Sequence, residues 1–408
     1  MPRSETFRSL RHRNTRFFLV GMLVSNIGTW MQSTAQVLLV LRLTGKGTDL
    51  GAVMFFQFVP LLLLGAWGGA VADRVNRRRM TIITQTLMTV QAAVLATLDL
   101  TGHATLHVVE LMALVLGVLS AIDNPARRGL LTELVDEDDI SNVLALNTAV
   151  MTGSRMFGPA LAGITVAAVG TGWCFVANAV SFVAVLGGLI LMNTDEIRRT
   201  PPTPRPRRPV RDGLAFVWRD PVLRLTFVLL VVVSTFAFNY QVSLALLNRK
   251  LHGGKASFGW LLAVNSVGSV IGSLLIASRR HIALRQFYGA ILLLGVASIA
   301  IGASPNLSTA FLLAVPLGIG GTMFVACSNA IVQPRTPPAM RGRVLALQST
   351  AFLGSTPIGS PITGWIGDHI GAGWSVAYGG IASVVAVAIV VALPTLSHRR
   401  TEAAGAPT

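Results

Sequence analysis

The residues of this chain that could do chemistry are charged side chains placed within or beside long apolar segments. Arg155 lies in the middle of one such segment, and Asp123 lies near the end of another. A charged side chain inside a bilayer costs at least about 2.5–3.5 kcal/mol on insertion scales, so it needs a partner or contact with water. We predict that Asp123 and Arg155 are coupling residues. Asp123 is expected to pair with Arg155 or, alternatively, with Arg77 or Arg78, and to exchange between these arginines during a conformational cycle.

Polar and aromatic residues also recur along one face of two apolar segments, 17–41 and 222–247. Their spacing is that of a helical stripe, and an offset of 207 residues superposes the two sets. Polar side chains avoid lipid because unsatisfied polar atoms there are costly. Two interpretations remain open: the stripes line a cavity that binds an organic molecule, or they form hydrogen bonds between helices. The candidate cavity residues are Asn26, Trp30, Ser33, Gln36, Phe236, Asn239, Tyr240 and Ser243.

Several other chemistries have no basis in the sequence. It contains no nucleophile–base pair, no P-loop and no HExxH motif, so we expect neither an enzyme nor a protein driven directly by ATP. His107 and Glu110 are too few ligands for a metal site. Cys174 and Cys327 lie in apolar segments and are predicted to be packing residues. We therefore expect no metal and no cofactor.

The composition indicates a membrane protein. Hydrophobic residues make up 52% of the 408 positions and charged residues only 12%, about half the charge of a soluble domain. Apolar stretches of about 20 residues predict an all-α protein with twelve transmembrane helices. The predicted spans are 17–41, 49–72, 80–100, 106–125, 143–169, 172–192, 222–247, 257–278, 285–303, 307–332, 344–367 and 374–396. The first span follows a polar, arginine-rich start with no cleavable signal pattern.

The distribution of basic residues predicts the orientation. Alternating the spans places 27 of the 33 Lys and Arg residues on one side of the membrane. The other side keeps Arg42, Lys46, Arg249, Lys250 and Lys255. The positive-inside rule then places both termini in the cytoplasm. Because the basic residues form short clusters between apolar runs, without interleaved aromatics, the net charge of +16 does not indicate nucleic-acid binding.

An internal repeat predicts two pseudo-symmetric six-helix bundles. Residues 142–164 and 343–365 match at an offset of 201, sharing a Val-Leu-Ala-Leu start and glycines at fixed spacing. The intervening segment 193–221 is the Pro-rich, charged stretch. We predict bundles at 1–192 and 222–408, joined by a solvated cytoplasmic linker at 193–221. A regulatory or lipid-surface role for the linker arginines is the alternative.

The loop between the second and third predicted helices reads GAVADRVNRRRM, from Gly69 to Met80. It resembles the signature loop of the major facilitator superfamily, with Asn76 where that family usually has glycine. By this resemblance Gly69 allows close helix contact, Asp73 faces a helix N-terminus, and the arginines hold the cytoplasmic end. The gating residues would be Gly69, Asp73, Arg74, Arg77 and Arg78. An ordinary positive-inside loop would explain the arginines but not Asp73 with Gly69.

A second motif lies in the fifth predicted helix, SRMFGPALAG from Ser154 to Gly163. It resembles the antiporter motif of exporters in the same superfamily. Ser154, Gly158 and Gly163 would form a groove for helix contact, and Pro159 would bend the helix. The alternative is a generic Gly/Pro kink.

With DNPARRGLLTELV (123–135) and the N-terminal FRSLRHRNTRFF, these motifs make the chain similar to the drug–proton antiporter branch. That branch includes tetracycline-type, macrolide-type and enterobactin-exporter-like proteins. The resemblance implies a major facilitator fold in the bacterial inner membrane, monomeric, with helices 1, 4, 7 and 10 lining a central cavity. It implies a secondary active transporter that exports amphipathic small molecules, such as drugs or siderophores, by proton antiport. The alternatives are a lipid or metabolite translocator or importer, and a non-transporting receptor or scaffold.

Overall fold

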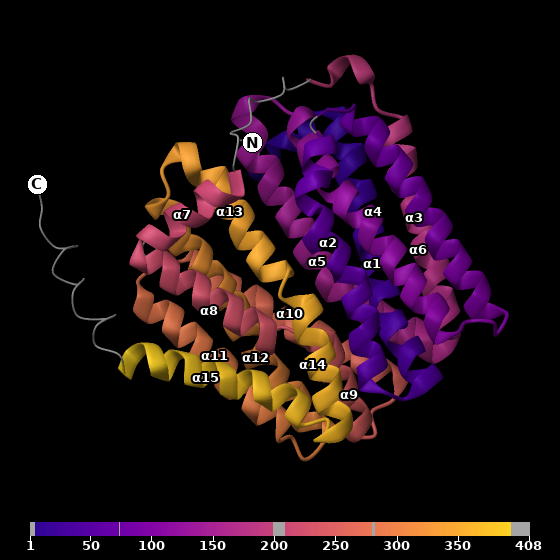
Figure 1. The fold of residues 1–408 in the computed structure, drawn as a ribbon. Helices are drawn as coiled ribbons and strands as arrows, with labels where there is room; N and C mark the ends of the chain where they lie inside the picture. Colours follow the sequence, from indigo (N-terminus) through magenta and orange to yellow (C-terminus); the bar gives the residue numbers. More distant parts are fainter. Residues whose placement is uncertain (1–4, 73, 199–208, 280–281, 393–408) are drawn as a thin grey trace, which may run out of the picture.

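The computed structural model describes residues 5–72, 74–198, 209–279 and 282–392, and within these ranges it contains helices and no strands (Figure 1). The N-terminal half comprises six long helices and three short 3₁₀ turns. Its elements are η1 (Glu5–Arg11), α1 (Arg13–Thr44), α2 (Gly47–Ala72), α3 (Arg77–Leu100), α4 (Leu106–Glu133), η2 (Glu137–Asp139), α5 (Ile140–Ala168), α6 (Thr171–Ile190) and η3 (Thr194–Glu196).

The C-terminal half begins with a short helix and contains two spans that are each broken into two helices. Its elements are α7 (Pro209–Arg219), α8 (Pro221–Ala237), α9 (Tyr240–Lys250), α10 (Lys255–Ala277), α11 (Leu284–Gly302), α12 (Leu307–Arg335), α13 (Pro338–Leu353), α14 (Thr356–His369) and α15 (Trp374–Ala392). The break between α8 and α9 falls at Phe238 and Asn239, and the break between α13 and α14 at Gly354 and Ser355.

Nine spans of the described chain are long and apolar enough to cross a membrane on composition alone, counting α8 and α9 as one. The other three segments of the predicted twelve are α1, α5 and the α13–α14 pair, which carry more polar residues. The predicted all-α membrane fold is therefore confirmed. The breaks at α8–α9 and α13–α14 were not predicted, because a short interruption leaves the apolar run intact.

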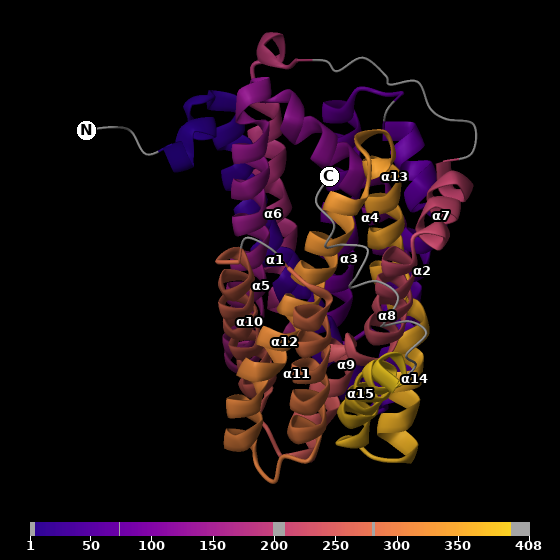
Figure 2. The same cartoon turned by 90° about the vertical axis from the view of Figure 1, so that its left-hand side faces the viewer.

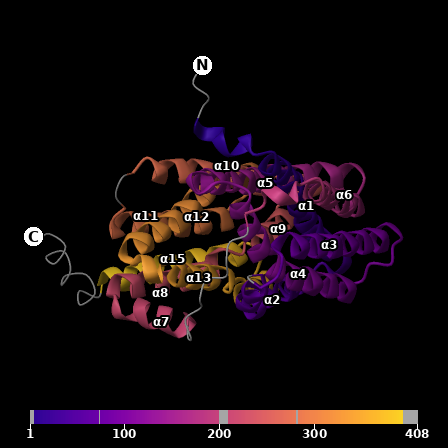
Figure 3. The ribbon, with the colours of Figure 1, turned by 90° about the horizontal axis from the view of Figure 1, so that it is seen from above.

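The two halves lie side by side (Figures 1 and 3). Between them α5 packs on α10 and α2 packs on α14, and smaller contacts join α9 and α13 to the N-terminal half. One end of the bundle carries the arginine clusters, the start of α3 and α7. We call it the arginine-rich side, and it is uppermost in Figures 1 and 2. The α1–α2, α9–α10 and α14–α15 turns lie at the other end, which we call the opposite side.

The segment predicted to be a solvated linker, 193–221, is partly structured. Residues 199–208 lie outside the described part of the chain. Beyond them α7 packs on α13, where a methyl group at Gly213 would lie 2.8 Å from Leu347 Cδ1. At the near end Asn14 exchanges hydrogen bonds with the backbone of Asn193, at 2.9 and 3.0 Å. Both described ends of the linker are thus attached to their own bundle.

Candidate functional site

Arg155, the charged residue at mid-depth of α5, lies against an aromatic ring of α1. Its guanidinium carbon is 5.1 Å from the centroid of the Trp30 ring, a cation–π distance. Its backbone oxygen accepts a 3.0 Å hydrogen bond from Ser266 of α10, in the other half. The side chain nevertheless remains exposed. The structure therefore brings together two residues that the sequence suggested separately, at the level where the halves meet.

The carboxylate of Asp123 has different partners from those predicted. It is fully buried and accepts hydrogen bonds from Thr84 Oγ1 at 2.6 Å and Gln85 Nε2 at 3.0 Å. Arg127 Nε forms an ion pair with Asp123 Oδ2 at 2.6 Å. The predicted contact with Arg155 is wrong, because Arg127 stands one helical turn away on the same helix and needs no reach across the bundle.

The rival partners of Asp123 are also engaged elsewhere. Arg77 Nη1 lies 2.7 Å from Glu133 Oε1, and Arg78 Nε donates to the Leu189 carbonyl at 2.7 Å. The prediction that Asp123 pairs with Arg77 or Arg78 is therefore wrong as well. The run DNPARR contained the correct signal, since it places an arginine four residues after the aspartate.

The polar stripe of α1 makes contacts at several levels. Ser33 Oγ accepts a 2.7 Å hydrogen bond from Gln241 Nε2 of α9, which joins the two halves. Gln36 is buried and donates to Gln57 of α2 at 3.4 Å. Asn26 is buried, and its Nδ2 has no hydrogen-bond partner among the described residues. Gln241 was not singled out from the sequence, although it is a polar residue inside an apolar segment.

Three of the four candidates on the seventh span pack within the C-terminal half. The Asn239 amide donates to Thr235 O at 2.7 Å and accepts from Ser360 Oγ at 3.0 Å. Ser243 donates to the Asn239 carbonyl at 3.1 Å, and the ring of Phe236 lies edge-on to Tyr378. The bond between Ser360 and Asn239 joins two spans, as the alternative interpretation expects, and the cavity lining stays a prediction for these three residues.

Tyr240, the fourth candidate, lies directly after the break between α8 and α9. Its ring centroid is 5.4 Å from that of Phe238, which also contacts Phe324 and Phe352. The buried Tyr240 hydroxyl has no hydrogen-bond partner among the described residues. Tyr240 thus has a polar group without a described partner, as Asn26 has, whereas Trp30, Ser33 and Arg155 contact residues at the junction of the halves.

The glycines of the α5 motif contact neighbouring helices at distances that a side chain would prevent. A methyl group at Gly158 would lie 2.4 Å from Trp30 Cβ, and one at Gly163 would lie 2.7 Å from the Ala256 carbonyl oxygen of α10. Pro159 contributes to the same contact, because a methyl group at Gly259 would lie 2.2 Å from its carbonyl. Ser154, in contrast, donates to Val150 O of its own helix at 2.8 Å.

The repeat-related glycines of α14 make the equivalent contacts. A methyl group at Gly359 would lie 1.9 Å from Thr235 O of α8, and one at Gly364 would lie 2.1 Å from Gly47 O of α2. Gly158 of α5 and Gly359 of α14 therefore each pack closely against the first span of their own half. Gly163 of α5 and Gly364 of α14 each pack closely against the second span of the other half. The offset of 201 residues thus predicts the pairing of helices.

The signature loop after α2 is only partly described. Asp73, the predicted gating carboxylate, lies outside the described residues. A close helix contact occurs at Gly68, where a methyl group would lie 2.3 Å from Ala121 O of α4; a methyl group at Gly69 would meet no atom of the described residues within 4 Å. Asn76 caps α3 in an extended conformation and accepts a hydrogen bond from Arg79 N at 3.0 Å. The Arg74 side chain is exposed.

On the opposite side the end of α14 caps the start of α2 across the two halves. Asp368 accepts hydrogen bonds from Gly47 N at 2.6 Å, Thr48 N at 2.8 Å and Thr48 Oγ1 at 2.6 Å. Arg249 of α9 also donates to the Gly45 carbonyl. A carboxylate at a helix N-terminus satisfies free amides and the helix dipole. These contacts close the opposite side, and sequence reasoning did not identify them.

The hydrogen bonds also set the charge state of Asp368, which lies beyond the predicted span 344–367. Partial burial by itself would raise the pKa of this carboxyl. The hydrogen bonds from Thr48 and Gly47 and the neighbouring His369 outweigh burial and hold the pKa below its ordinary value of 3.8. Asp368 is therefore charged at neutral pH in this conformation.

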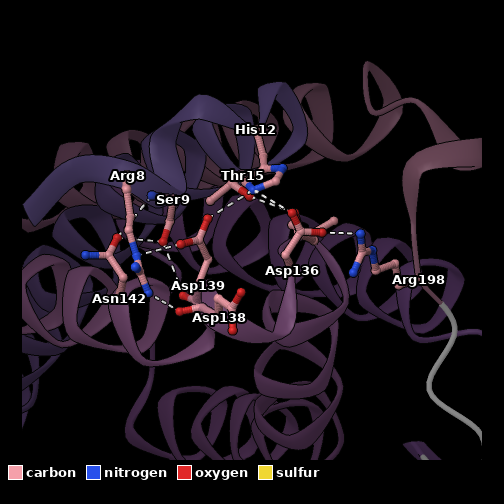
Figure 4. Close-up of polar contacts among 10 residues, drawn as sticks. Arg8, Ser9, His12, Thr15, Asp136, Asp138, Asp139, Asn142 and Arg198 are labelled. Carbon is pink, nitrogen blue, oxygen red and sulfur yellow. Dashed lines mark hydrogen bonds and ion pairs between the residues drawn. The ribbon is translucent and has the colours of Figure 1, made fainter. Parts of the chain in front are cut away.

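Ion pairs on the arginine-rich side, as far as the structure describes them, join residues of the same half. In the N-terminal half the acidic 136–139 loop binds η1, the start of α1 and the start of the linker (Figure 4). Arg8 Nε lies 2.6 Å from Asp139 Oδ1, and Arg198 pairs with Asp136. In the C-terminal half Arg335 pairs with Asp220, and Arg343 with Asp212. The described contacts thus hold the halves together at mid-depth and on the opposite side.

Comparisons with known proteins agree with this architecture. A family model described as "Transmembrane secretion effector" matches residues 4–405. The staphyloferrin A transporter of Staphylococcus aureus is 25% identical over 362 residues, covering 88% of this chain and 90% of that protein. The multidrug efflux pump Tap of Mycolicibacterium fortuitum is 25% identical, with 86% and 89% covered. The enterobactin exporter EntS of Shigella flexneri is also 25% identical, with 86% and 81% covered.

Solved structures show the same fold at lower identity. A bacterial homologue of the lysosomal transporter Spinster, described as inward-facing, superposes with a TM-score of 0.70 at 14% identity, covering 94% of this chain and 96% of that one. A bacterial homologue of the iron transporter ferroportin, also described as inward-facing, has a TM-score of 0.72 at 16% identity, with 95% and 99% covered.

Proposed function

The chain belongs to the transmembrane secretion effector family of major facilitator transporters, and we propose that it exports amphipathic small organic molecules by proton antiport. Its relatives named for a siderophore transporter, a siderophore exporter and a multidrug pump favour export as the direction. The family is one of transporters, not enzymes. Siderophores, drugs or compounds of similar chemistry are the proposed substrate class.

The observation that carries the proposal is the Arg155 guanidinium over Trp30 at the junction of the halves. An arginine beside a tryptophan binds a molecule that has both an acceptor group and an apolar or aromatic part. Tyr240, with a buried hydroxyl lacking a described partner, supplies a further polar group from the other half. A mainly apolar site with a few polar groups is typical of small-molecule binding.

We further propose that the arginine-rich side is cytoplasmic, in accordance with the positive-inside rule. The conformation, joined at mid-depth and on the opposite side, is then the one that loads substrate from the cytoplasm. Export would require the Asp368–Thr48 and Gly163–Ala256 contacts to separate. Protons are the proposed coupling ion, the Asp123–Arg127 pair is the proposed buried element that responds to them, and the working unit is a monomer.

Purified protein in liposomes with an imposed pH gradient tests this proposal. Protein oriented with its arginine-rich side outward should accumulate tetracycline or a carboxylate siderophore when the lumen is acidic. Arg155→Gln should lower the rate at least tenfold for acceptor-bearing substrates, because an ion-assisted hydrogen bond contributes about 1.5–3 kcal/mol. Uptake that ignores the pH gradient, or movement of phospholipid instead of these solutes, would contradict it.

A further inference from the structure

The opposite side contains a cavity of about 700 Å³ that lies between the two halves. One wall comes from the α1–α2 turn, and the other comes from α9, the α9–α10 turn and the end of α14. The lining residues on which the argument depends are Lys46, Asp49, Arg249, Lys250, His252 and Asp368. Because both halves supply its walls, the cavity exists in this form only while the halves are joined on this side.

The charges around this cavity are unusual for their side of the protein. Orientation by the arginine clusters leaves five Lys and Arg residues on the opposite side, and Arg42 pairs with Asp99. Three of the other four, Lys46, Arg249 and Lys250, line the cavity. A side otherwise depleted of positive charge therefore concentrates it at one place.

The three cations of the cavity outnumber its two acidic residues, Asp49 and Asp368. Asp368 is occupied by the amides and hydroxyl at the start of α2. Asp49 lies in the first turn of α2, where the helix dipole favours a negative charge. Lys46 and Lys250 form no ion pair with any residue that the structure describes, and both are exposed. Their ammonium groups are thus available to a ligand.

The backbone beside the cavity is held in a strained conformation. His252 has φ 55°, and it is the non-glycine residue with positive φ in the described chain. Such a conformation costs of order 1–3 kcal/mol and persists where the surroundings hold it, often at binding or switch sites. Here the positive φ turns the chain between α9 and α10, and His252 lines the cavity together with Lys250.

We propose that this cavity binds a small polycarboxylate from the solution on the opposite side, and that the bound anion holds that side closed. Lys46 comes from the N-terminal half and Lys250 from the C-terminal half, so an anion with two carboxylates bridges them. The cavity volume matches that of small-molecule sites, about 300–1,000 Å³. A ligand that binds only the closed arrangement shifts the equilibrium toward it by a factor of 1 + [L]/Kd.

The consequence for transport is inhibition from the far side. An exporter must open its opposite side to release substrate, so an anion that stabilises closure there slows the cycle. At ten times its Kd the anion should favour the closed arrangement about elevenfold. An anionic compound that accumulates outside would in this way limit its own further release.

A distance measurement on the full-length protein tests the proposal with citrate as the probe. Spin labels replace exposed Thr101 and Ser308, which lie at the opposite-side ends of α3 and α12. Citrate should increase the population with the shorter distance, saturably. The double variant Lys46→Gln/Lys250→Gln should need at least ten times more citrate for the half-maximal shift. Lys255→Gln, which removes a basic residue of the same side outside the cavity, should retain it.

The result does not depend on what the protein exports, so this inference and the proposed function fail separately. Equal responses to citrate in the double variant and in Lys255→Gln would overturn the site, as would the absence of any citrate response. The distance measurements use protein in phosphatidylcholine nanodiscs. A parallel measurement, without citrate, uses nanodiscs that contain phosphatidylglycerol. If phosphatidylglycerol alone produces the full shift and citrate adds nothing, the anion is a lipid headgroup and the soluble ligand is excluded.

Discussion

The carboxylate of Asp368 offers a direct perturbation of the closed opposite side. It accepts three hydrogen bonds from the first turn of α2, which belongs to the other half. Asn is about as good a helix cap as Asp, so Asp368→Asn removes mainly the charge–dipole term, about 0.3–1 kcal/mol. Asp368→Ala also removes the cap, which brings the loss to about 1–2 kcal/mol. The equilibrium between closed and open arrangements should therefore shift roughly two- to fivefold for Asn and 5- to 30-fold for Ala.

The same label pair at Thr101 and Ser308 measures this shift as a change in the two distance populations. Glu110→Gln is the control, because Glu110 is a carboxylate of the same side that lies outside the cavity and pairs with His107 of its own helix. Its removal should alter both arrangements equally. The expected order of open population is therefore Ala above Asn, with Glu110→Gln equal to wild type.

The pH dependence gives a second check on Asp368. Its pKa is below 3.8 in the closed arrangement, whereas an Asp368 released from α2 should titrate near 3.8. The carboxylate thus stabilises closure at pH above 3.8, and this contribution is lost as the pH falls through the lowered pKa. Distances should not change between pH 5 and 8 on account of this group. Closure that is unchanged in Asp368→Ala, or that weakens between pH 8 and 6 only when Asp368 is present, would refute the reasoning.

Three further predictions concern the buried charges and the glycine contacts. Asp123→Asn leaves Arg127 without its ion-pair partner and should lower the free energy of unfolding by about 3 kcal/mol or less, since Arg127 is not fully buried. In thermal unfolding the double variant Asp123→Asn/Arg127→Gln should recover part of this loss, and strict additivity would exclude the pair. Gly163→Ala should push α5 away from α10 and increase the open population on the opposite side. Gly153→Ala is the control, because its added methyl group would meet no atom of the described residues within 4 Å. Equal effects of the two variants would refute the contact. Arg155→Lys keeps the charge but loses the planar group over Trp30. The ratio of the transport rate of an aromatic anionic substrate to that of an aliphatic one should therefore fall. An unchanged ratio would exclude a stacking role.

The sequence predicted the architecture because that prediction depends on patterns that tolerate local error. Apolar runs, arginine asymmetry and the 201-residue repeat each extend over many residues. In the structure the repeat-related Gly158 and Gly359 make equivalent contacts, because a glycine needed for close approach occupies the same place in both copies. The breaks at Asn239 and Ser355 escaped prediction because a single turn of irregular backbone changes neither hydropathy nor length.

Side-chain partners were predicted less well, since they depend on rotation about each helix axis. Polar spacing suggested that Asn239 and Ser243 share a cavity face with Tyr240. The helix break instead turns Asn239 toward Thr235 and Ser360. Asp123 was assigned partners across the bundle, but Arg127 was nearer along its own helix. The Asp368 cap joins residues more than 300 positions apart, and no periodic pattern indicates such a contact.

Access to position 155 from each side of the membrane tests the central claim most directly. A cysteine at this position, Arg155→Cys, can be probed with a membrane-impermeant thiol reagent, because native Cys174 and Cys327 are fully buried. In vesicles that expose the arginine-rich side, position 155 should react rapidly, and an acceptor-bearing aromatic substrate should slow the reaction. In vesicles of the other orientation it should react slowly, and faster when Asp368→Ala is added. Equal reaction from both sides, or no reaction from the arginine-rich side, would contradict a central site with alternating access.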